Sequence, residues 1–275
     1  MENFMTYLDE TIRTLQEEEQ NLISSDRKDE ANFVKIKINI CDICKTIYTV
    51  SAKTHDGAAL KQEYIRQLTR LPENWKMSLE KAKTDYFHID VMDGKFVEKD
   101  TYSKMREYAE YIKRISNLPL DVHLMVEDVE TGIEVFSAVE PNIITFHLEA
   151  CKDSEDVMDN IKRIKEVGAR VGISIKPNTP IEKIYQYLPY IHMCLIMTVE
   201  PGKGGQTLIT DMLDKISELK KYVEENSLEL DIEVDGGINL KTAERVKAAG
   251  ANILVAGTAI LAATDYKVII DELRK

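Results

Sequence analysis

Residues 86–125 read YFHIDVMDGKFVEKDTYSKMREYAEYIKRISNLPLDVHLM, and this stretch decides the fold. It begins with a short apolar and β-branched run, Tyr86–Val91, continues through a longer amphipathic stretch, Tyr102–Ile115, and ends with a second short run, Leu120–Met125. The short runs have the length and composition of strands, whereas the middle stretch has the periodicity of a helix. A strand, a helix and a strand in this order predict a βαβ unit with parallel strands.

The same alternation continues through the rest of the chain. Further strands are expected at Ile143–His147, Arg170–Ile175, Cys194–Val199, Leu230–Val234 and Ile253–Ala256. Further helices are expected at Asp156–Val167, Thr210–Asn226 and Lys241–Ala249. Strand and helix units repeated in series, with polar residues at the carboxyl ends of the strands, favour a (β/α)8 TIM barrel over an open doubly wound sheet. We therefore expect residues 84–275 to form an α/β barrel domain.

Residues 1–83 follow a different pattern and predict an atypical, largely helical N-terminal region. Residues 2–24 are rich in Glu, Gln and Leu and predict a helix, and either Asp26 or Asp29 can start a second one. Residues 58–83 predict one or two further helices, broken near Pro72.

The segment Val34–Ile40 leaves two interpretations open. Its sequence, VKIKINI, alternates strictly between apolar and polar residues, which is a strand pattern. The alternative is one apolar face of a helix, formed by Ile36, Ile40, Ile43, Ile47 and Val50. An eight-stranded barrel needs one strand more than residues 84–275 supply, and residues 34–42 are the candidate for it.

Composition and charge narrow the class of protein. The chain of 275 residues has a formal net charge of −12, most of it within residues 84–275. An acidic barrel argues against a nucleic acid partner, whereas an anionic small molecule can still bind through backbone amides. Because there is no apolar run of membrane-helix length and no signal-peptide pattern at the N-terminus, we expect a cytoplasmic protein without a membrane partner. We also expect a homo-oligomer.

Cysteine usage gives no disulfide framework, since the chain has only four cysteines. Cys41 and Cys44 form one Cys-x-x-Cys pair without a second pair or a neighbouring histidine. Such a pair alone is a weak zinc or redox signal, and we interpret these residues as packed free thiols.

Polar residues at the ends of the expected strands form the candidate site. His88 and Asp90 stand two residues apart on one strand, so their side chains point the same way. His123 belongs to the next strand, and Asp235 ends a later one. Two imidazoles and two carboxylates suit one divalent metal ion, Zn, Fe, Mn or Co. Asp90 and Asp235 would face each other across the pocket, one removing and one returning a proton beside a carbonyl, through a metal-stabilised enediolate.

Glycine clusters after three later strands predict a phosphate site. They are Pro201-Gly202-Lys203-Gly204-Gly205, Gly236-Gly237 and Gly257-Thr258. In barrels, the backbone amides of the loops after the last strands commonly bind phosphate. Near the strand ends recur Met92, Met125 and Met197. These methionines either fill the core or form an apolar lining that excludes water from the reacting carbon.

Six stretches resemble the signatures of the ribulose-phosphate 3-epimerase family in order and spacing. They are HIDVMDGKFV (88–97), LDVHLMV (120–126), FHLEA (146–150), MTVEPGKGGQ (197–206), IEVDGGI (232–238) and AGTAI (256–260). The resemblance covers about residues 84–262 and leaves residues 1–83 unmatched.

This resemblance implies an isomerase of carbohydrate metabolism, an epimerase of the pentose phosphate pathway that interconverts D-ribulose 5-phosphate and D-xylulose 5-phosphate. It implies that Asp90 accepts the proton, that Asp235 donates it, and that both hold the metal ion together with His88 and His123. The residues implied to contact the substrate, chiefly its phosphate, are His123, Gly202, Lys203, Gly204, Gly205, Gly236, Gly237, Gly257 and Thr258.

Three features depart from the family pattern. Residues 1–83 lack the Pro-Ser motif of the family's first strand, which implies a helical module in place of the first βα unit. Glu98-Lys99-Asp100 replaces a Pro-Asn sequence, and Lys203 replaces an aromatic or apolar residue.

Other functions stay open at this stage. The same chemistry would epimerise a related hexulose 6-phosphate, such as allulose 6-phosphate. A relative that binds metal or sugar phosphate without turnover is compatible with the missing Pro-Ser motif. A decarboxylase of the orotidine-monophosphate type is less compatible, because no lysine occupies the matching positions around Asp90.

Overall fold

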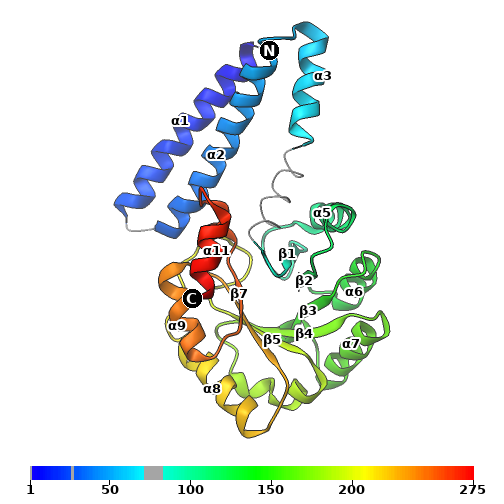
Figure 1. Ribbon diagram of the computed structural model, residues 1–275. Coiled ribbons are helices and arrows are strands. Elements are labelled where there is room, and N and C mark those ends of the chain that lie inside the picture. Colours follow the sequence, from blue (N-terminus) through cyan, green and yellow to red (C-terminus); the bar gives the residue numbers. More distant parts are fainter. Residues whose placement is uncertain (1, 26–27, 71–82) are drawn as a thin grey trace. The chain divides into compact units, whose positions relative to one another are not determined.

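The computed structural model describes residues 2–25, 28–70 and 83–275 (Figure 1). The chain divides into two compact units. The smaller consists of Met1–Lys83 with Thr258–Ile270, and the larger of Thr84–Gly257 with Asp271–Lys275. The boundary after Lys83 falls where the sequence changes its pattern.

The larger unit contains a seven-stranded parallel sheet in which the strands lie side by side in sequence order. The strands are β1 (Phe87–Met92), β2 (Leu120–Met125), β3 (Ile143–His147), β4 (Arg170–Ile175), β5 (Met193–Met197), β6 (Asp231–Asp235) and β7 (Ile253–Val255). Strands β2, β3 and β4 have the bounds that the sequence predicts, and the other four differ from them by one or two residues. The predicted α/β barrel fold is confirmed in this alternation of parallel strands and helices.

Helices follow the strands and lie on the outer face of the curled sheet (Figure 1). They are α5 (Tyr102–Ile115), α6 (Val129–Ser137), α7 (Ser154–Glu166), α8 (Met212–Glu225) and α9 (Leu240–Ala249), with the short 3-10 helices η1 (Leu148–Ala150), η2 (Ile181–Lys183) and η3 (Tyr185–Tyr190). In α8 the buried residues recur every three or four positions, as one face of a helix requires: Met212, Ile216, Leu219 and Val223. The chain ends with α10 (Gly257–Leu261) and α11 (Tyr266–Arg274).

The inner face of the sheet carries buried polar side chains among a mostly apolar core. They are Asp121, His123, Thr145, His147, Ser174 and Glu233. Within each strand they alternate with apolar residues, so they share one face. The register pairs His88 with Asp121 and Asp90 with His123. The polar residues of neighbouring strands therefore converge inside the curl of the sheet.

The smaller unit is helical, as the sequence predicts. It contains α1 (Glu2–Ser24), α2 (Lys28–Ser51) and α3 (Gly57–Leu68). Helices α1 and α2 pack through an apolar cluster formed by Ile12, Leu22, Ala31, Val34 and Ile38. The predicted helix break near Pro72 lies outside the described residues.

The candidate first strand at residues 34–42 is wrong, because this segment lies within α2. Among the described residues the sheet has seven strands rather than eight. The apolar residues that face α1 are Ala31, Val34 and Ile38, at spacings of three and four, and this helical contact outweighs the local alternation. The predicted helical face is also wrong in part, since the side chains of Ile40 and Val50 are exposed.

A pair of substitutions separates the helical from the extended form of this segment. Ile38 is 7% exposed and Ile40 is 41% exposed, although both would share one face of a strand. We expect Ile38→Ala to lower the free energy of unfolding by about 2–5 kcal/mol, because it removes buried methyl groups. Ile40→Ala, the matched control, should change it by less than about 0.5 kcal/mol. Equal losses in chemical denaturation would contradict the helix.

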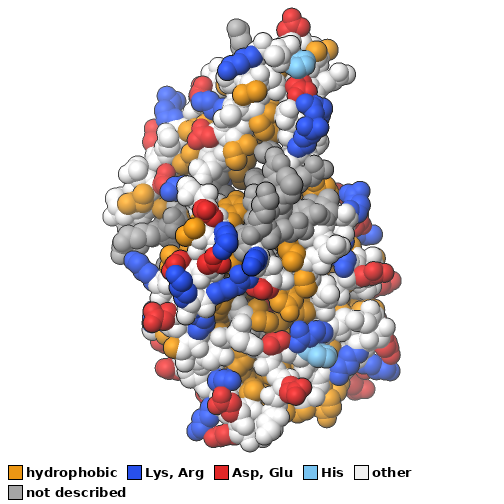
Figure 2. All heavy atoms as spheres, viewed as in Figure 1, with side chains coloured by type: hydrophobic (Ala, Val, Ile, Leu, Met, Phe, Trp, Pro, Cys, Tyr) orange, Lys and Arg blue, Asp and Glu red, His pale blue; other side chains and the backbone are white. Residues whose placement is uncertain are grey.

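The structure also describes the cysteines, the surface charge and the length of the helices. All four cysteines are free thiols: Cys41, Cys44, Cys151 and Cys194. Figure 2 shows basic and acidic side chains interspersed over the face in view. Within residues 2–25, 28–70 and 83–275, no helix combines the length and the apolar character needed to cross a membrane.

Candidate active site

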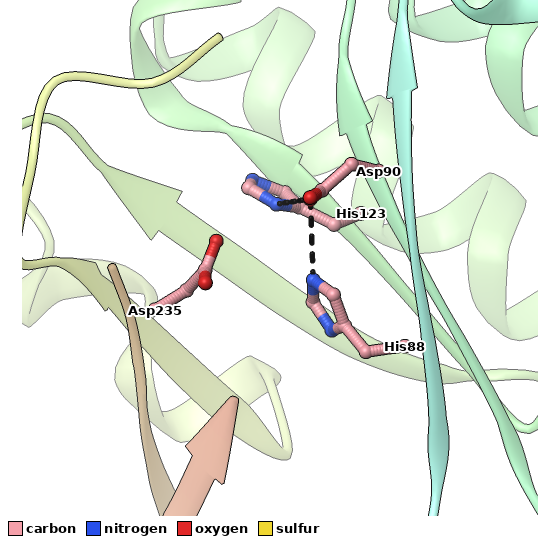
Figure 3. A group of neighbouring side chains, drawn as sticks. All are labelled: His88, Asp90, His123 and Asp235. Atoms are coloured by element: carbon pink, nitrogen blue, oxygen red, sulfur yellow. Dashed lines mark hydrogen bonds and ion pairs between the residues drawn. The ribbon is translucent and has the colours of Figure 1, made fainter. Parts of the chain in front are cut away.

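The structure brings together the four residues predicted to form the metal and proton-transfer site. His88 and Asp90 come from β1, His123 from β2 and Asp235 from the end of β6. One nitrogen or oxygen atom of each residue lies within 4.8 Å of those of the other three. Figure 3 shows Asp90 between the two imidazoles and Asp235 facing them from the other side of the site. Because β1 and β6 are separated by four strands, only the curl of the sheet allows this approach.

The two ring nitrogens of His88 have different surroundings. Nδ1 lies 2.6 Å from Asp121 Oδ2, a hydrogen bond, and 3.7 Å from Glu233 Oε1. Nε2 lies 3.4 Å from Asp90 Oδ1 and, within the described part of the chain, is a buried atom without a hydrogen-bond partner. Burial acts against a positive charge here, but the charges of Asp121 and Glu233 outweigh it and raise the pKa of His88.

His123 also divides its nitrogens between two neighbours. Nδ1 lies 3.1 Å from Asp90 Oδ1, and Nε2 lies 3.0 Å from Nε2 of His147 on β3. Each histidine therefore directs one nitrogen toward Asp90 and uses the other in a contact outside the four-residue group.

This donor set fits a divalent cation. Two imidazole nitrogens and two carboxylates are ligands that Zn, Fe, Mn and Co accept. Nε2 of His88 is buried and has no hydrogen-bond partner among the described residues, so it is available as a metal ligand. Nδ1 of the same ring is hydrogen-bonded to Asp121, and metal-bound imidazoles usually have such a carboxylate partner. His88, Asp90, His123 and Asp235 are thus able to hold one ion.

The two carboxyl groups of the site have pKa values shifted in opposite directions. Burial alone would raise the pKa of Asp90, because it disfavours the charged carboxylate. The interactions with His123 and His88 outweigh burial and lower this pKa. Burial and the negative charge of Asp90 raise the pKa of Asp235 to about 6. Two carboxyl groups whose pKa values are driven apart can serve as base and acid of one reaction.

Sequence reasoning missed a second layer of polar residues behind the site. Asp121 and Glu233 are buried beside His88, and burial together with Asp121 raises the pKa of Glu233. His147 and Glu149 stand in the same way behind His123. The available signal was the strand period of two, since Asp121 and Glu233 precede His123 and Asp235 by two residues and share their face.

The predicted substrate loops follow β5, β6 and β7, and their role stays a prediction. Gly236 and Gly237 adopt positive φ angles of 114° and 68°. A Cβ at Gly236 would lie 2.3 Å from Val199 Cγ2, and one at Gly237 would lie 2.4 Å from Leu208 N. Packing alone therefore requires glycine at both positions. Gly202, Lys203, Gly204 and Gly205 lie in the loop after β5, Gly257 follows β7, and Thr258 belongs to the smaller unit.

The three methionines are buried near the carboxyl ends of their strands. Met92 and Met125 are register partners and pack with Phe96 and Val97. Met197 is the register partner of Asp235 and packs with Leu195 and Val199. Both roles predicted for them, core filling and pocket lining, are compatible with these positions.

Two of the departures from the family pattern lie close together. Lys203 Nζ is 4.0 Å from Glu98 Oε2, and the Lys203 side chain is 75% exposed. An ion pair this exposed contributes little stability.

Comparisons with known proteins show the family to which the chain belongs. The model of the Ribulose-phosphate 3 epimerase family matches residues 66–261, so the match starts within α3, earlier than residue 84. A ribulose-phosphate 3-epimerase of Bacillus subtilis is 41% identical over 197 residues, covering 71% of this chain and 88% of the relative. One of Escherichia coli K12 is 38% identical over 197 residues, covering 70% and 84%.

Solved structures support the fold alone, because their sequences are distant. A 3-keto-L-gulonate-6-phosphate decarboxylase from Vibrio cholerae has a TM-score of 0.53 at 14% identity, covering 70% of this chain and 85% of that one. A tryptophan synthase complex chain from Pyrococcus furiosus has a TM-score of 0.52 at 15% identity, covering 73% and 90%.

The fold and the site thus define a (β/α)-barrel enzyme with a His/Asp site suited to a metal ion. The relatives place it among the isomerases, as an epimerase that acts on carbohydrates. The chain belongs to the ribulose-phosphate 3-epimerase family.

Proposed function

We propose that this protein is a ketose-phosphate 3-epimerase that interconverts D-ribulose 5-phosphate and D-xylulose 5-phosphate by two-base proton transfer. The observation that carries the proposal is the meeting of Asp90 and Asp235 in one site from opposite sides of the curled sheet, where the pKa of Asp90 is lowered and that of Asp235 is raised. The names of the relatives supply the substrate.

In the proposed reaction, the ionised carboxylate of Asp90 takes the proton from carbon 3, beside the carbonyl at carbon 2. The electron pair of the broken C–H bond moves to the carbonyl oxygen and gives an enediolate. Protonated Asp235 then returns a proton to carbon 3 from the opposite face, which inverts the stereocentre. The reverse reaction exchanges the two roles.

We propose that His88, Asp90, His123 and Asp235 hold one divalent ion, Zn, Fe, Mn or Co. When bound, this ion supplies a positive charge that stabilises the developing negative oxygen. His88 and His123 would each present one unprotonated ring nitrogen to the ion. For His88 this requires release of the proton that its raised pKa favours.

We further propose that the phosphate of the substrate is held by the loops after β5, β6 and β7. The residues concerned are His123, Gly202, Lys203, Gly204, Gly205, Gly236, Gly237, Gly257 and Thr258. Backbone amides in such loops bind phosphate irrespective of the acidic net charge. Met92, Met125 and Met197 would line the pocket and exclude water from the reacting carbon.

The domain organisation, location and assembly belong to the same proposal. Residues 84–275 would form the catalytic domain, and residues 1–83 a separate helical region. A cytoplasmic location, a homo-oligomeric state and the absence of nucleic acid partners stay predictions.

A coupled assay on the purified full chain tests the proposed reaction. D-ribulose 5-phosphate should be converted to D-xylulose 5-phosphate, whereas allulose 6-phosphate should react much more slowly. Preference for the hexulose phosphate would change the substrate but keep the mechanism. Background rates on both substrates with the ion fully loaded would overturn the proposal in favour of a binding protein without turnover.

A further inference from the structure

A row of hydrogen-bonding groups leads away from the site behind His123. His123 Nε2 lies 3.0 Å from His147 Nε2, and His147 Nδ1 lies 3.1 Å from Glu149 Oε2. These three side chains come from β2, from the end of β3 and from η1. His123 and His147 are fully buried, so water has no access to their ring nitrogens.

Glu149 is held as an ionised acceptor at the far end of this row. Its Oε1 accepts hydrogen bonds from the backbone N–H of Lys176, at 2.7 Å, and from the hydroxyl of Thr179. Burial acts against its charge, but the hydrogen bonds from His147, Thr179 and Lys176 lower the pKa of Glu149 to about 2. A carboxylate in this form accepts hydrogen bonds and donates none.

The segment that holds Glu149 is itself anchored. Lys215 Nζ of α8 donates to the carbonyl oxygens of Pro177, at 2.6 Å, and Thr179, at 2.8 Å. Phe96 covers His147 with its ring centroid at 4.8 Å, and Lys176 Nζ lies 3.7 Å from the Phe96 centroid. Glu149 is therefore fixed relative to His147.

Hydrogen-bond direction along the row follows from this acceptor. Because Glu149 only accepts, His147 carries its proton on Nδ1. Full burial of His147 favours its neutral ring, and with the proton on Nδ1 the lone pair of that ring is on Nε2. Two ring nitrogens 3.0 Å apart share one proton, which therefore belongs to Nε2 of His123. With Nε2 of His123 protonated, the lone pair that this ring can offer to a metal ion is on Nδ1, which lies 3.1 Å from Asp90 Oδ1. Without the ion, Nδ1 can instead carry a proton that it donates to Asp90.

We propose that His147 and Glu149 are positioning residues that select the tautomer of His123, so that Nδ1 is the atom offered to the metal ion. This inference rests on the metal site of the proposed function. In this proposal the two histidines of the site have the same kind of support, because a carboxylate fixes the protonated nitrogen of each ring. Asp121 backs His88 directly, whereas Glu149 backs His123 through one intervening imidazole.

The substitution Glu149→Gln tests the proposal because it reverses the direction of the hydrogen bonds between residue 149, His147 and His123. Its carbonyl oxygen would remain opposite the Lys176 N–H, and its NH2 group would donate to His147 Nδ1. His147 would then carry its proton on Nε2, and His123 would be protonated on Nδ1. We expect the dissociation constant for Zn²⁺, measured by competition with a chromophoric chelator, to rise by about 10–100-fold.

Two controls accompany this variant. Glu155→Gln makes the same change at an exposed position on α7 and should leave Zn²⁺ affinity unaltered. Glu149→Asp keeps a carboxylate, so it should preserve the tautomer and most of the affinity that Glu149→Gln loses.

A second readout needs no metal ion. The chain has five histidines, so ¹⁵N-labelled imidazoles can be resolved by NMR in the metal-free protein. We expect His147 to be protonated on Nδ1 and not on Nε2, and His123 to be protonated on Nε2. In Glu149→Gln the proton between the two rings should move to Nε2 of His147. The opposite pattern in the wild type would overturn the proposal, as would unchanged Zn²⁺ affinity in Glu149→Gln. If the wild type binds no Zn²⁺ but shows the expected tautomers, the metal site fails and the hydrogen-bond direction stands.

Discussion

Asp90→Asn is expected to lower kcat for D-ribulose 5-phosphate epimerisation by about 10²–10⁴-fold, because an amide cannot take the proton from carbon 3. The structure adds a reason for choosing this residue. Asp90 Oδ1 lies 3.1 Å from His123 Nδ1 and 3.4 Å from His88 Nε2, and these contacts lower the pKa of Asp90. The measurement is kcat at saturating substrate and saturating metal ion, with the bound metal determined by mass spectrometry.

The matched control is Asp211→Asn, at an exposed residue that makes no side-chain cap for α8. Its kcat should equal that of the wild type. If the Asp90→Asn variant retains more than about a tenth of the wild-type kcat, Asp90 is not the base. Because Asp90 is also a proposed ligand, a variant that has lost its metal would be informative only after reloading.

Removal of divalent metal is expected to reduce kcat by at least about 10²–10³-fold, and its return should restore the rate. The physical reason lies in the charge that develops on the substrate beside Asp90, which the imidazoles alone do not neutralise. Dialysis against a chelator followed by re-addition of Zn, Fe, Mn or Co tests this. The ion that restores the rate best identifies the metal.

The chelated protein should keep its helical circular dichroism, since an extensive apolar core holds the sheet and helices together. A full rate at a metal content far below one ion per chain would rule out the proposed metal chemistry. Loss of rate that no ion restores would instead indicate irreversible damage, which circular dichroism would reveal.

Most of the barrel was predictable because its signals are local. The stretches around Leu120–Met125 and Ile143–His147 are short buried runs between amphipathic helices, and their bounds follow directly from the sequence. His88 and Asp90 could be placed on one face because a strand repeats every two residues. The four-residue site followed from the expectation that parallel strands present their carboxyl ends at the same edge.

The segment Val34–Ile40 shows why the sequence alone could not decide between a strand and a helix. Its alternation suited a strand, but the cluster that Val34 and Ile38 form with Ile12 and Leu22 of α1 made it a helix. A local pattern that suits both forms is decided by the partner it packs against.

The sequence by itself determined the order of strands and helices after residue 84, the helical character of residues 2–24, and the residue types of the site. These depend on periodicity over a few neighbouring residues. Only the tertiary structure decided that Asp121 and Glu233 lie beside His88 and that His147 and Glu149 lie behind His123. Those contacts join residues far apart in the chain, and burial then sets the protonation of each group.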